Sequence, residues 1–573
     1  MKKILSYYRP YIPVVLIMIV LLFFQAMGEL ALPAYMSKII DEGIIVGDLK
    51  YIFQTGINML MVAFLLMLCS ILAGFFAART SAATTKKIRS EIFTKVTSFS
   101  KAELDNFSTA SLITRSTNDI QQIQTASVMI MRFAFFAPVM GVGALVKAIT
   151  TSPGLSWTIA LAIGALSCVM LFTFKITLPK FGQVQRMVDK LNLIMNERLT
   201  GSLVIRAFNA EKREEDRFDR SNKELMELNL FVNRAMAFNM PLMMLIMNFT
   251  AMLIVWAGAS LVDLGTLQIG NILAFIQYSM QVIMSFLFIS MMFIMIPRAV
   301  VSAKRVAEVL EIKPKIIDDV QPEFPNIKGE IEFKNVSFRY ADAEANVLSN
   351  ISFTAKPGQM TAFIGSTGSG KSTLINLIPR FFDVTEGAIL IDGIDIRKIP
   401  QKYLRNSIGL VPQKGVLFSG TIESNLRFGA ENASFQELEK AAEIAQALDF
   451  IREKPEGFED PISQGGTNVS GGQKQRLSIA RALAKNPPIY IFDDSFSALD
   501  FKTDAALRNA LRENVGESTM LVVAQRINTI KDAESIIVLN DGEIAGIGTH
   551  SELLRTCDVY REIAESQLDK GEM

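Results

Sequence analysis

The stretch Gly365-Ser366-Thr367-Gly368-Ser369-Gly370-Lys371-Ser372-Thr373 decides the fold of the second half of the chain. It follows the apolar run Ala362-Phe363-Ile364 and precedes an apolar segment, which is the strand, loop and helix order of a P-loop. Glycines let backbone N–H groups approach phosphate oxygens, and the start of the next helix favours the same negative charge. We predict that all nine residues bind nucleotide, that Lys371 reaches the β- and γ-phosphates and that the Ser372 hydroxyl holds Mg²⁺.

A second element of the same chemistry lies further along the chain. The run Pro488-Ile489-Tyr490-Ile491-Phe492-Asp493 is a mostly apolar strand that ends in an aspartate, which is the Walker B pattern. We predict that Asp493 anchors the Mg²⁺ ion through water. Together with the alternating strands predicted at 329–333 and 336–340, these elements indicate an α/β P-loop NTPase domain, without choosing among its branches.

The first 300 residues have a different character. Half of all residues are hydrophobic and the mean hydropathy is +0.30, and nearly all the long apolar runs lie before residue 300. A helix that crosses the hydrocarbon core needs roughly 20 apolar residues. Six segments meet this length: 12–33, 54–78, 129–150, 155–175, 238–261 and 269–297. Turn residues at 150–154 and 263–265 link spans three to four and five to six tightly.

The charges between the spans predict their orientation. The two long connections, 79–128 and 176–237, are rich in Lys and Arg, whereas the short ones at 150–154 and 262–268 have none. Basic residues mark the cytoplasmic side, so both termini and both long connections are predicted to be cytoplasmic. The long connections contain few Gly or Pro and are predicted to be helical extensions of the spans. The acidic stretch with Asp41, Glu42 and Asp48 is expected to be an external loop.

Composition sets the domain boundaries and excludes some partners. We predict a membrane domain over 1–312, a linker with Pro and charge over 313–328 and a nucleotide-binding domain over 329–573. The net charge of +1 gives no reason to expect a nucleic-acid partner. The three isolated cysteines offer no metal spacing or disulfide framework. Glu29 and Arg132 lie in or near apolar spans, where a charge faces a cavity, a helix contact or the interface.

A third motif indicates which branch of the P-loop proteins this chain resembles. The run Val469-Ser470-Gly471-Gly472-Gln473, followed by Gln475-Arg476-Leu477, closely resembles the ABC signature. Over nearly its whole length the chain resembles a bacterial multidrug-type ABC exporter half-transporter. The resemblance implies a type I exporter fold: an all-α transmembrane domain with six helices and long cytoplasmic extensions, followed by an α/β ATP-binding cassette.

The resemblance also implies roles for individual residues. Tyr340 matches the aromatic residue that stacks on adenine, and Gln413 matches the Q-loop residue that contacts Mg²⁺ and the attacking water. Asp500, in Ser497-Ala498-Leu499-Asp500, matches the D-loop. In the family, two nucleotide-binding domains close head to tail, so the signature residues complete the partner's ATP site: Ser470, Gly471, Gly472 and Gln473. The stretches 106–114 and 207–217 resemble the coupling helices.

Two residues depart from the family pattern. The glutamate that normally follows the Walker B aspartate is Asp494, and the switch histidine is Gln525. The only histidine in the chain is His550, so no imidazole is available at the switch position. The Asp494 side chain is one methylene shorter, and a misplacement of about 1 Å can cost on the order of 100-fold in rate. We therefore predict a degenerate site that retains ATP and Mg²⁺ binding but hydrolyses poorly.

A degenerate site favours a heterodimer with a second half-transporter that carries the consensus glutamate and histidine. The expected function is ATP-driven export of drugs or other amphiphilic compounds across a bacterial inner membrane. A lipid flippase, a peptide exporter half and an ATP-binding regulatory subunit remain alternatives, as does a homodimer with two slow sites. Ten methionines in spans five and six suit varied apolar ligands or plain helix packing, and the sequence does not name a substrate.

Overall fold

The computed structural model describes residues 2–340 and 343–567, which form two compact units. One unit comprises the chain up to Thr97 together with Thr109–Ile312. The other comprises Ser98–Ser108 together with the chain from Lys313 onward. Residues 98–108, which the domain prediction places in 1–312, therefore group with the second unit.

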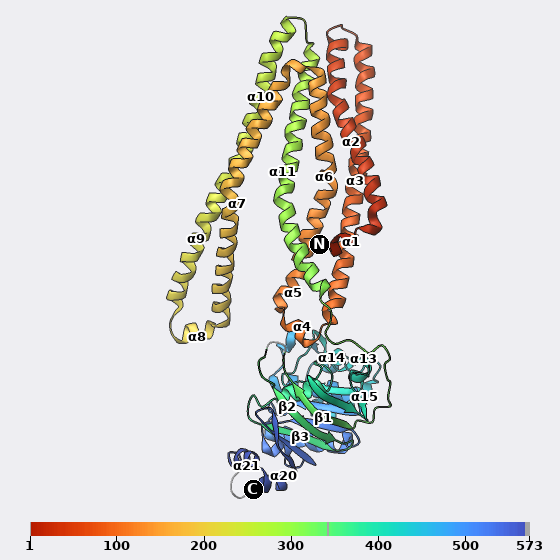
Figure 1. Cartoon of the computed structure of the whole chain (residues 1–573), viewed down its shortest axis with the longest axis vertical. Coiled ribbons are helices and arrows are strands. Elements are labelled where there is room, and N and C mark those ends of the chain that lie inside the picture. Colours follow the sequence, from red (N-terminus) through yellow and green to blue (C-terminus); the bar gives the residue numbers. More distant parts are fainter. Residues whose placement is uncertain (1, 341–342, 568–573) are drawn as a thin grey trace. The chain divides into compact units, whose positions relative to one another are not determined.

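The first unit is entirely helical (Figure 1). Its helices in chain order are α1 (Lys2–Ser6), η1 (Arg9–Tyr11), α2 (Ile12–Lys38), the π-helix η2 (Ile39–Ile44), α3 (Leu49–Thr97), α5 (Thr109–Ser116), α6 (Asn118–Thr151), η3 (Pro153–Leu155), α7 (Ser156–Thr200), α8 (Ser202–Ala207), α9 (Glu211–Ala237), α10 (Asn239–Asp263) and α11 (Ile269–Glu311). Among the described residues, six helical stretches are long and apolar enough to cross a membrane, as predicted. The chain is a multi-pass membrane protein.

The spans extend far beyond the hydrocarbon thickness. Helices α3, α7 and α11 contain 49, 45 and 43 residues, and a helix rises about 1.5 Å per residue. The predicted helical extensions are therefore present. Pro33, the last residue of predicted span one, lies inside α2, which runs on to Lys38. A proline removes only one helical hydrogen bond, which packing against neighbouring helices offsets here.

Small side chains bring α2, α3, α6 and α11 close together. Ala26, Ala73 and Ala144 are fully buried in one cluster that also contains Phe275 and Tyr278. Small residues allow close backbone approach between membrane helices, where lipid provides no hydrophobic driving force. The Tyr278 hydroxyl donates to the Leu30 carbonyl oxygen at 3.2 Å, which satisfies a polar group inside the bundle.

The structure corrects the prediction of a loop directly after span one. Asp41 lies in η2, is 9% exposed, and its Oδ1 accepts a hydrogen bond from the backbone N of Gly270 at 2.7 Å. Ser37 Oγ donates to Asp41 Oδ2 at 3.1 Å. The carboxylate thus holds a free N–H at the start of α11, which explains why an acidic residue is buried there.

Each stretch that resembles a coupling helix contains a turn followed by the start of a helix, α5 in 106–114 and α9 in 207–217. α4 (Lys101–Asp105) begins at the capping residue Ser100 and ends before 106–108, which form a turn. α8 ends at Ala207, and the turn that follows contains Asn209 with φ 48°. The predicted stretches 106–114 and 207–217 therefore begin at the ends of these short helices. A capping box of Ser100 and Glu103 sets the start of α4, whereas α8 has no side-chain cap.

The second unit contains mixed sheets. The strands are β1 (Ile331–Phe338), β2 (Leu348–Ala355), β3 (Met360–Gly365), β4 (Glu386–Ile391), β5 (Ile394–Asp395), β6 (Ile408–Val411), β7 (Gly420–Thr421), β8 (Pro461–Ile462), β9 (Ile489–Asp493), β10 (Thr519–Val523), β11 (Ser535–Asn540) and β12 (Glu543–Gly548). The helices besides α4 are α12 (Lys371–Leu377), α13 (Gln401–Asn406), α14 (Ile422–Arg427), α15 (Phe435–Ile444), α16 (Leu448–Arg452), η4 (Gly457–Glu459), η5 (Gln464–Gly466), α17 (Gly471–Ala484), α18 (Phe501–Val515), α19 (Ile527–Ile530), α20 (His550–Thr556) and α21 (Asp558–Glu565).

The central sheet has the strand order β12-β11-β3-β10-β9-β6. β3, β10 and β9 are parallel, with Val523 opposite both Phe363 and Asp493. The loops after these three strands therefore leave the sheet at one edge. This is the edge where ligands bind in open α/β sheets.

Candidate functional site

The P-loop takes a conformation that requires glycine. Gly368 and Gly370 have φ values of 87° and 96°, a region that side chains with a Cβ rarely adopt. A Cβ on Gly370 would also lie 2.7 Å from Leu348 Cδ2. Helix α12 begins directly after this glycine, at Lys371. The sequence thus fixes both the turn and the position of the lysine.

The ammonium group of Lys371 lies within the loop. Its Nζ donates to the carbonyl oxygens of Gly365 at 2.8 Å and Ser366 at 2.7 Å. Burial lowers the pKa of Lys371, and the charges of Asp494 and Asp493 partly offset this effect. A buried ammonium that has only neutral oxygens as hydrogen-bond acceptors fits an anionic ligand.

Ser372 and Asp493 face each other across the site. Ser372 Oγ donates to Asp493 Oδ1 at 3.1 Å. Burial raises the pKa of the Asp493 carboxyl, while the hydrogen bond from Ser372 acts in the opposite direction. A hydroxyl and a carboxylate at this separation are hard oxygen donors of the kind that Mg²⁺ prefers.

Asp494 is hydrogen-bonded to two other predicted site residues. It is 7% exposed, has a φ of 45°, and its backbone N donates to the Val523 carbonyl oxygen at 3.0 Å. Its Oδ2 accepts two hydrogen bonds, from Gln413 Nε2 at 3.2 Å and from Gln525 Nε2 at 2.7 Å. The structure thus brings together three of the predicted residues, from the ends of β6, β9 and β10, at one carboxylate oxygen.

Tyr340 is tied to the start of α12. Its hydroxyl lies 3.0 Å from Thr373 Oγ1, and its ring makes edge contacts with Phe338 and Phe382. The aromatic side chain is therefore fixed beside the P-loop, and it is 37% exposed. An exposed ring held at this place is available for a flat ligand group.

One open cavity contains most of the predicted nucleotide-binding residues. Its lining comprises Val347, Ile364, Gly365, Ser366, Thr367, Gly368, Gly370, Lys371, Ser372, Thr373, Gln413, Gln525, Ile563, Ser566 and Gln567. The predicted Ser369 is buried and outside this lining, although its Oγ accepts from Lys371 Nζ at 3.3 Å. Asp493 is also outside the lining and bonds to Ser372, which is part of it. Sequence reasoning missed Ile563, Ser566 and Gln567, because no local motif marks the end of the C-terminal helix.

The signature and D-loop residues lie outside this lining, within the part of the chain that the structure describes. Ser470 is exposed and caps α17, with its backbone N donating to Gln473 Oε1 at 3.0 Å. Asp500 caps α18 by accepting from the backbone N of Thr503 at 3.0 Å. Gly471 is exposed beside Ser470, and Gly472 is half-buried. These helix starts are open for contact with another molecule.

His550 lies in α20, 25 residues after the switch position, and makes its side-chain hydrogen bond elsewhere. Its Nδ1 lies 2.7 Å from the Tyr560 hydroxyl, so it joins α20 to α21. Burial lowers the pKa of this imidazole. The sole histidine of the chain therefore has a packing role and does not replace Gln525.

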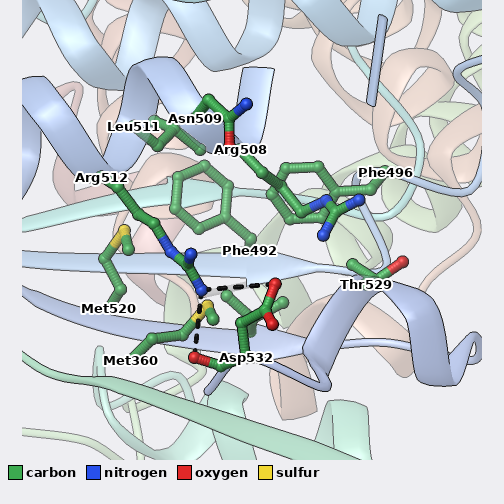
Figure 2. Close-up of a pocket in the computed structure, with 11 residues that line it drawn as sticks. Met360, Phe492, Phe496, Arg508, Asn509, Leu511, Arg512, Met520, Thr529 and Asp532 are labelled. Atoms are coloured by element: carbon green, nitrogen blue, oxygen red, sulfur yellow. Dashed lines mark hydrogen bonds and ion pairs between the residues drawn. The ribbon is translucent and has the colours of Figure 1, made fainter. Parts of the chain in front are cut away.

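A second, small cavity lies between α18, α19 and the central sheet (Figure 2). Arg508 donates to the Asn528 carbonyl oxygen at 3.0 Å, and Arg512 donates to the Asp532 carbonyl oxygen at 3.0 Å. Figure 2 shows the Arg512 side chain reaching Asp532. Because both heads are held by the chain, this cavity supports packing, and we assign it no ligand.

Comparisons with known proteins now identify the family. The family model described as ABC transporter transmembrane region matches residues 15–286, and the model described as ABC transporter matches residues 348–497. An uncharacterized ABC transporter ATP-binding protein of Mycobacterium tuberculosis is 39% identical over 564 residues, covering 98% of this chain and 97% of that protein. The chain belongs to the ABC transporter family. Its membrane and ATP-binding domains share one chain, so it is an ABC exporter half-transporter.

Other similar proteins agree with this assignment. An ATP-dependent lipid A-core flippase of Syntrophus aciditrophicus is 34% identical over 499 residues, covering 85% of the half-transporter and 81% of the flippase. The solved structure of a bacterial Atm1-family ABC exporter with ATP bound superposes with a TM-score of 0.80 at 25% identity, covering 98% of this chain and 99% of that one. An ABC ATPase domain implies ATP binding, usually with Mg²⁺, and Lys371 and Ser372 of the cavity lining, with the Asp493 carboxylate bonded to Ser372, fit both.

Proposed function

We propose that this half-transporter forms a heterodimeric exporter in which its own ATP site binds nucleotide but hydrolyses it poorly. One observation carries the proposal: the same oxygen of Asp494 accepts the amides of Gln413 and Gln525. The residue that should orient the attacking water is engaged by two neutral donors. The two departures from the family pattern, Asp494 and Gln525, thus meet at Asp494 Oδ2.

The geometry of Asp494 supports slow hydrolysis. The aspartate is one methylene shorter than the family's glutamate, and its short side chain keeps Oδ2 at the amides. A carboxylate set back by about 1 Å from a productive position loses on the order of 100-fold in rate. Gln525 can donate a hydrogen bond to a phosphate oxygen, yet it carries no imidazolium charge.

The residues that bind nucleotide are intact in this proposal. Lys371 contacts the β- and γ-phosphates, Tyr340 stacks on the adenine, and Ser372, Gln413 and Asp493 hold the Mg²⁺ ion directly or through water. When bound, Mg²⁺ supplies neutralising charge to the phosphate oxygens. The P-loop residues bind phosphate through backbone N–H groups.

The signature residues serve the partner. Ser470, Gly471, Gly472 and Gln473 lie at the exposed start of α17, away from this chain's own cavity, and complete the partner's consensus site. The partner provides a Walker B glutamate and a switch histidine, and D-loop residue Asp500 faces the same interface. Retained ATP then biases the pair towards the closed state only as far as it binds that state more tightly.

The substrate is an amphiphilic compound, and the membrane is a bacterial inner membrane with both termini in the cytoplasm. A cavity in the membrane unit supports this substrate class, with Met170, Phe174 and Met243 among its mostly apolar lining and Arg298 beside them. The basic residues of the long connections support the orientation.

A lipid flippase is the second candidate. Two relatives at 34% and 33% identity are named ATP-dependent lipid A-core flippases. A cavity with apolar walls and one guanidinium also fits an acyl chain with an anionic headgroup. Reconstituted protein that moves a fluorescent anionic phospholipid between leaflets, and does not move cationic dyes, favours the flippase. The reverse result favours the drug exporter.

The proposal is tested by inactivating one site at a time in the assembled pair. Replacing the partner's Walker B glutamate with glutamine should abolish steady-state ATP hydrolysis, whereas Asp494→Asn should lower it less than two-fold, because turnover occurs at the partner's P-loop. Equal losses for both variants would contradict the asymmetric pair and support two equivalent sites. Full transport by the partner without this chain would instead support a regulatory subunit.

A further inference from the structure

The end of the C-terminal helix reaches the nucleotide cavity. Ile563, Ser566 and Gln567 line it together with Lys371 and Gln525. Ile563 lies in the last turn of α21, and Ser566 and Gln567 directly follow the helix, whose Tyr560 and Ala564 are fully buried in the core of the second unit. The bond between His550 and Tyr560 adds a polar attachment to α20. The helix end is therefore held in place by packing, and its last described residues have a defined position at the cavity.

Gln567 holds the backbone on both sides of Arg526. Its Nε2 donates to the Gln525 carbonyl oxygen at 2.8 Å, and its Oε1 accepts from the backbone N of Ile527 at 2.9 Å. A side-chain amide that gives one hydrogen bond and receives one acts like a paired strand just past the end of β10. This double contact fixes the peptide groups that orient Gln525.

The Gln525 side chain in turn contacts Asp494, the residue that follows the Walker B aspartate. Its Nε2 donates to Asp494 Oδ2 at 2.7 Å. The contacts therefore form an unbroken sequence from Gln567 through the Gln525 main chain and side chain to Asp494. Each step is a direct hydrogen bond, and the last one reaches the carboxylate that follows the Walker B aspartate.

We propose that Gln567 is a positioning residue for Gln525, and that it tunes how this site distinguishes ATP from ADP. The inference rests on the proposed function, in which Gln525 occupies the switch position beside the terminal phosphate. ADP lacks that phosphate, so a misplaced Gln525 weakens ATP binding and leaves ADP binding unchanged. Gln567 and Gln525 are both solvent-exposed, and one exposed neutral hydrogen bond changes affinity by roughly three-fold to five-fold.

The experiment titrates ATP and ADP separately into the full-length chain in lipid nanodiscs by displacement of a fluorescent ATP analogue. Gln567→Ala should lower the ATP affinity by about three-fold to five-fold with no change for ADP. Gln567→Glu keeps the acceptor for Ile527 but repels the Gln525 carbonyl oxygen, so it should resemble Gln567→Ala. Glu565→Gln is the matched control and should leave both affinities unchanged, because Glu565 ends the same helix, is exposed and lies outside the lining of this cavity.

A double-mutant cycle separates positioning from simple packing. If Gln567 acts through Gln525, the pair Gln525→Ala and Gln567→Ala should match Gln525→Ala alone in its ratio of ATP to ADP affinity. Additive losses, equal losses for ATP and ADP, or no effect of Gln567→Ala would each overturn the positioning role. Thermal unfolding of each variant shows whether a loss follows from misfolding, which would affect both nucleotides. Failure of the unmodified chain to bind ATP would instead refute the proposed function.

Discussion

Gln525 Nε2 lies 2.7 Å from Asp494 Oδ2 and donates a hydrogen bond to it. The two positions that serve hydrolysis in the family are thus bonded directly to each other. Gln413 donates to the same oxygen, so the carboxylate has two neutral amides as partners. A substitution at either residue should therefore alter the position of the other residue's side chain.

Restoring the family residues should restore hydrolysis at this site. The pair Asp494→Glu and Gln525→His places a longer carboxylate and an imidazole at the cavity, and we expect turnover at this chain's P-loop to rise by on the order of 100-fold. ATP hydrolysis is measured in an assembled pair whose partner glutamate is replaced by glutamine. Asp494→Asn serves as the control and should stay at background. No increase for the restored pair would show that another feature limits the site.

Lowering the pH should abolish the gain in ATP affinity from Mg²⁺ at a higher pH than it abolishes ATP binding itself. Burial raises the pKa of Asp493 above the ordinary aspartate value of about 3.8. The carboxylate that ligates Mg²⁺ is thus protonated at a higher pH than a free aspartate as the pH falls. We expect the gain in ATP affinity from Mg²⁺ to disappear as the pH falls through that raised pKa. Titrations with and without Mg²⁺ between pH 7 and pH 4 measure this gain, and Asp493→Asn should lack it at every pH.

Gly270→Ala should destabilise the membrane unit. A Cβ at this position would lie 2.5 Å from both Asp41 Oδ2 and the Ser37 carbonyl oxygen. Overpacking of this kind costs about 1–3 kcal/mol, and here it also disturbs the bond from Gly270 to Asp41. Thermal unfolding in detergent should show a lower midpoint. Gly56→Ala, in α3 with no atom within 4 Å of the added Cβ, should leave the midpoint unchanged or raise it slightly.

Glu103→Gln should loosen the segment that follows α11. Glu103 is 2% exposed, and its Oε1 accepts from the backbone N of Lys315 at 3.0 Å. Burial alone raises the pKa of Glu103, yet the hydrogen bonds from Ser100 and Lys315 lower it overall. A lowered carboxyl pKa means that its ionised form stabilises the fold above the unfolded pKa of about 4.3, and that this is lost as the pH falls through the folded value.

The glutamine variant removes that charge at neutral pH, so trypsin should cleave at Lys313 and Lys315 several times faster. Glu311→Gln changes an exposed carboxylate two residues before Lys313 and is the control. Equal cleavage rates for both variants and the unmodified chain would show that Glu103 does not anchor the segment.

The sequence predicted those features that depend on local pattern. Apolar length gave the six spans, and the glycine spacing gave the P-loop around Lys371, because both signals are contained in short windows. Features set by distant contacts were not predictable. The local sequence around Asp41 is typical of a loop. Its burial depends on a hydrogen bond from the backbone N of Gly270, which is 229 positions away. Gln567 has no motif, and only the fold places it against Gln525.

The most direct test of the central claim compares ATP hydrolysis by this half-transporter alone and with its candidate partner, in the same nanodisc lipids. The account predicts that the chain alone binds ATP with turnover near background, and that the pair hydrolyses it at a rate abolished by replacing the partner's Walker B glutamate. Hydrolysis by the chain alone at the rate of the pair would contradict the account, because Asp494 and Gln525 would then be serviceable replacements in a homodimer.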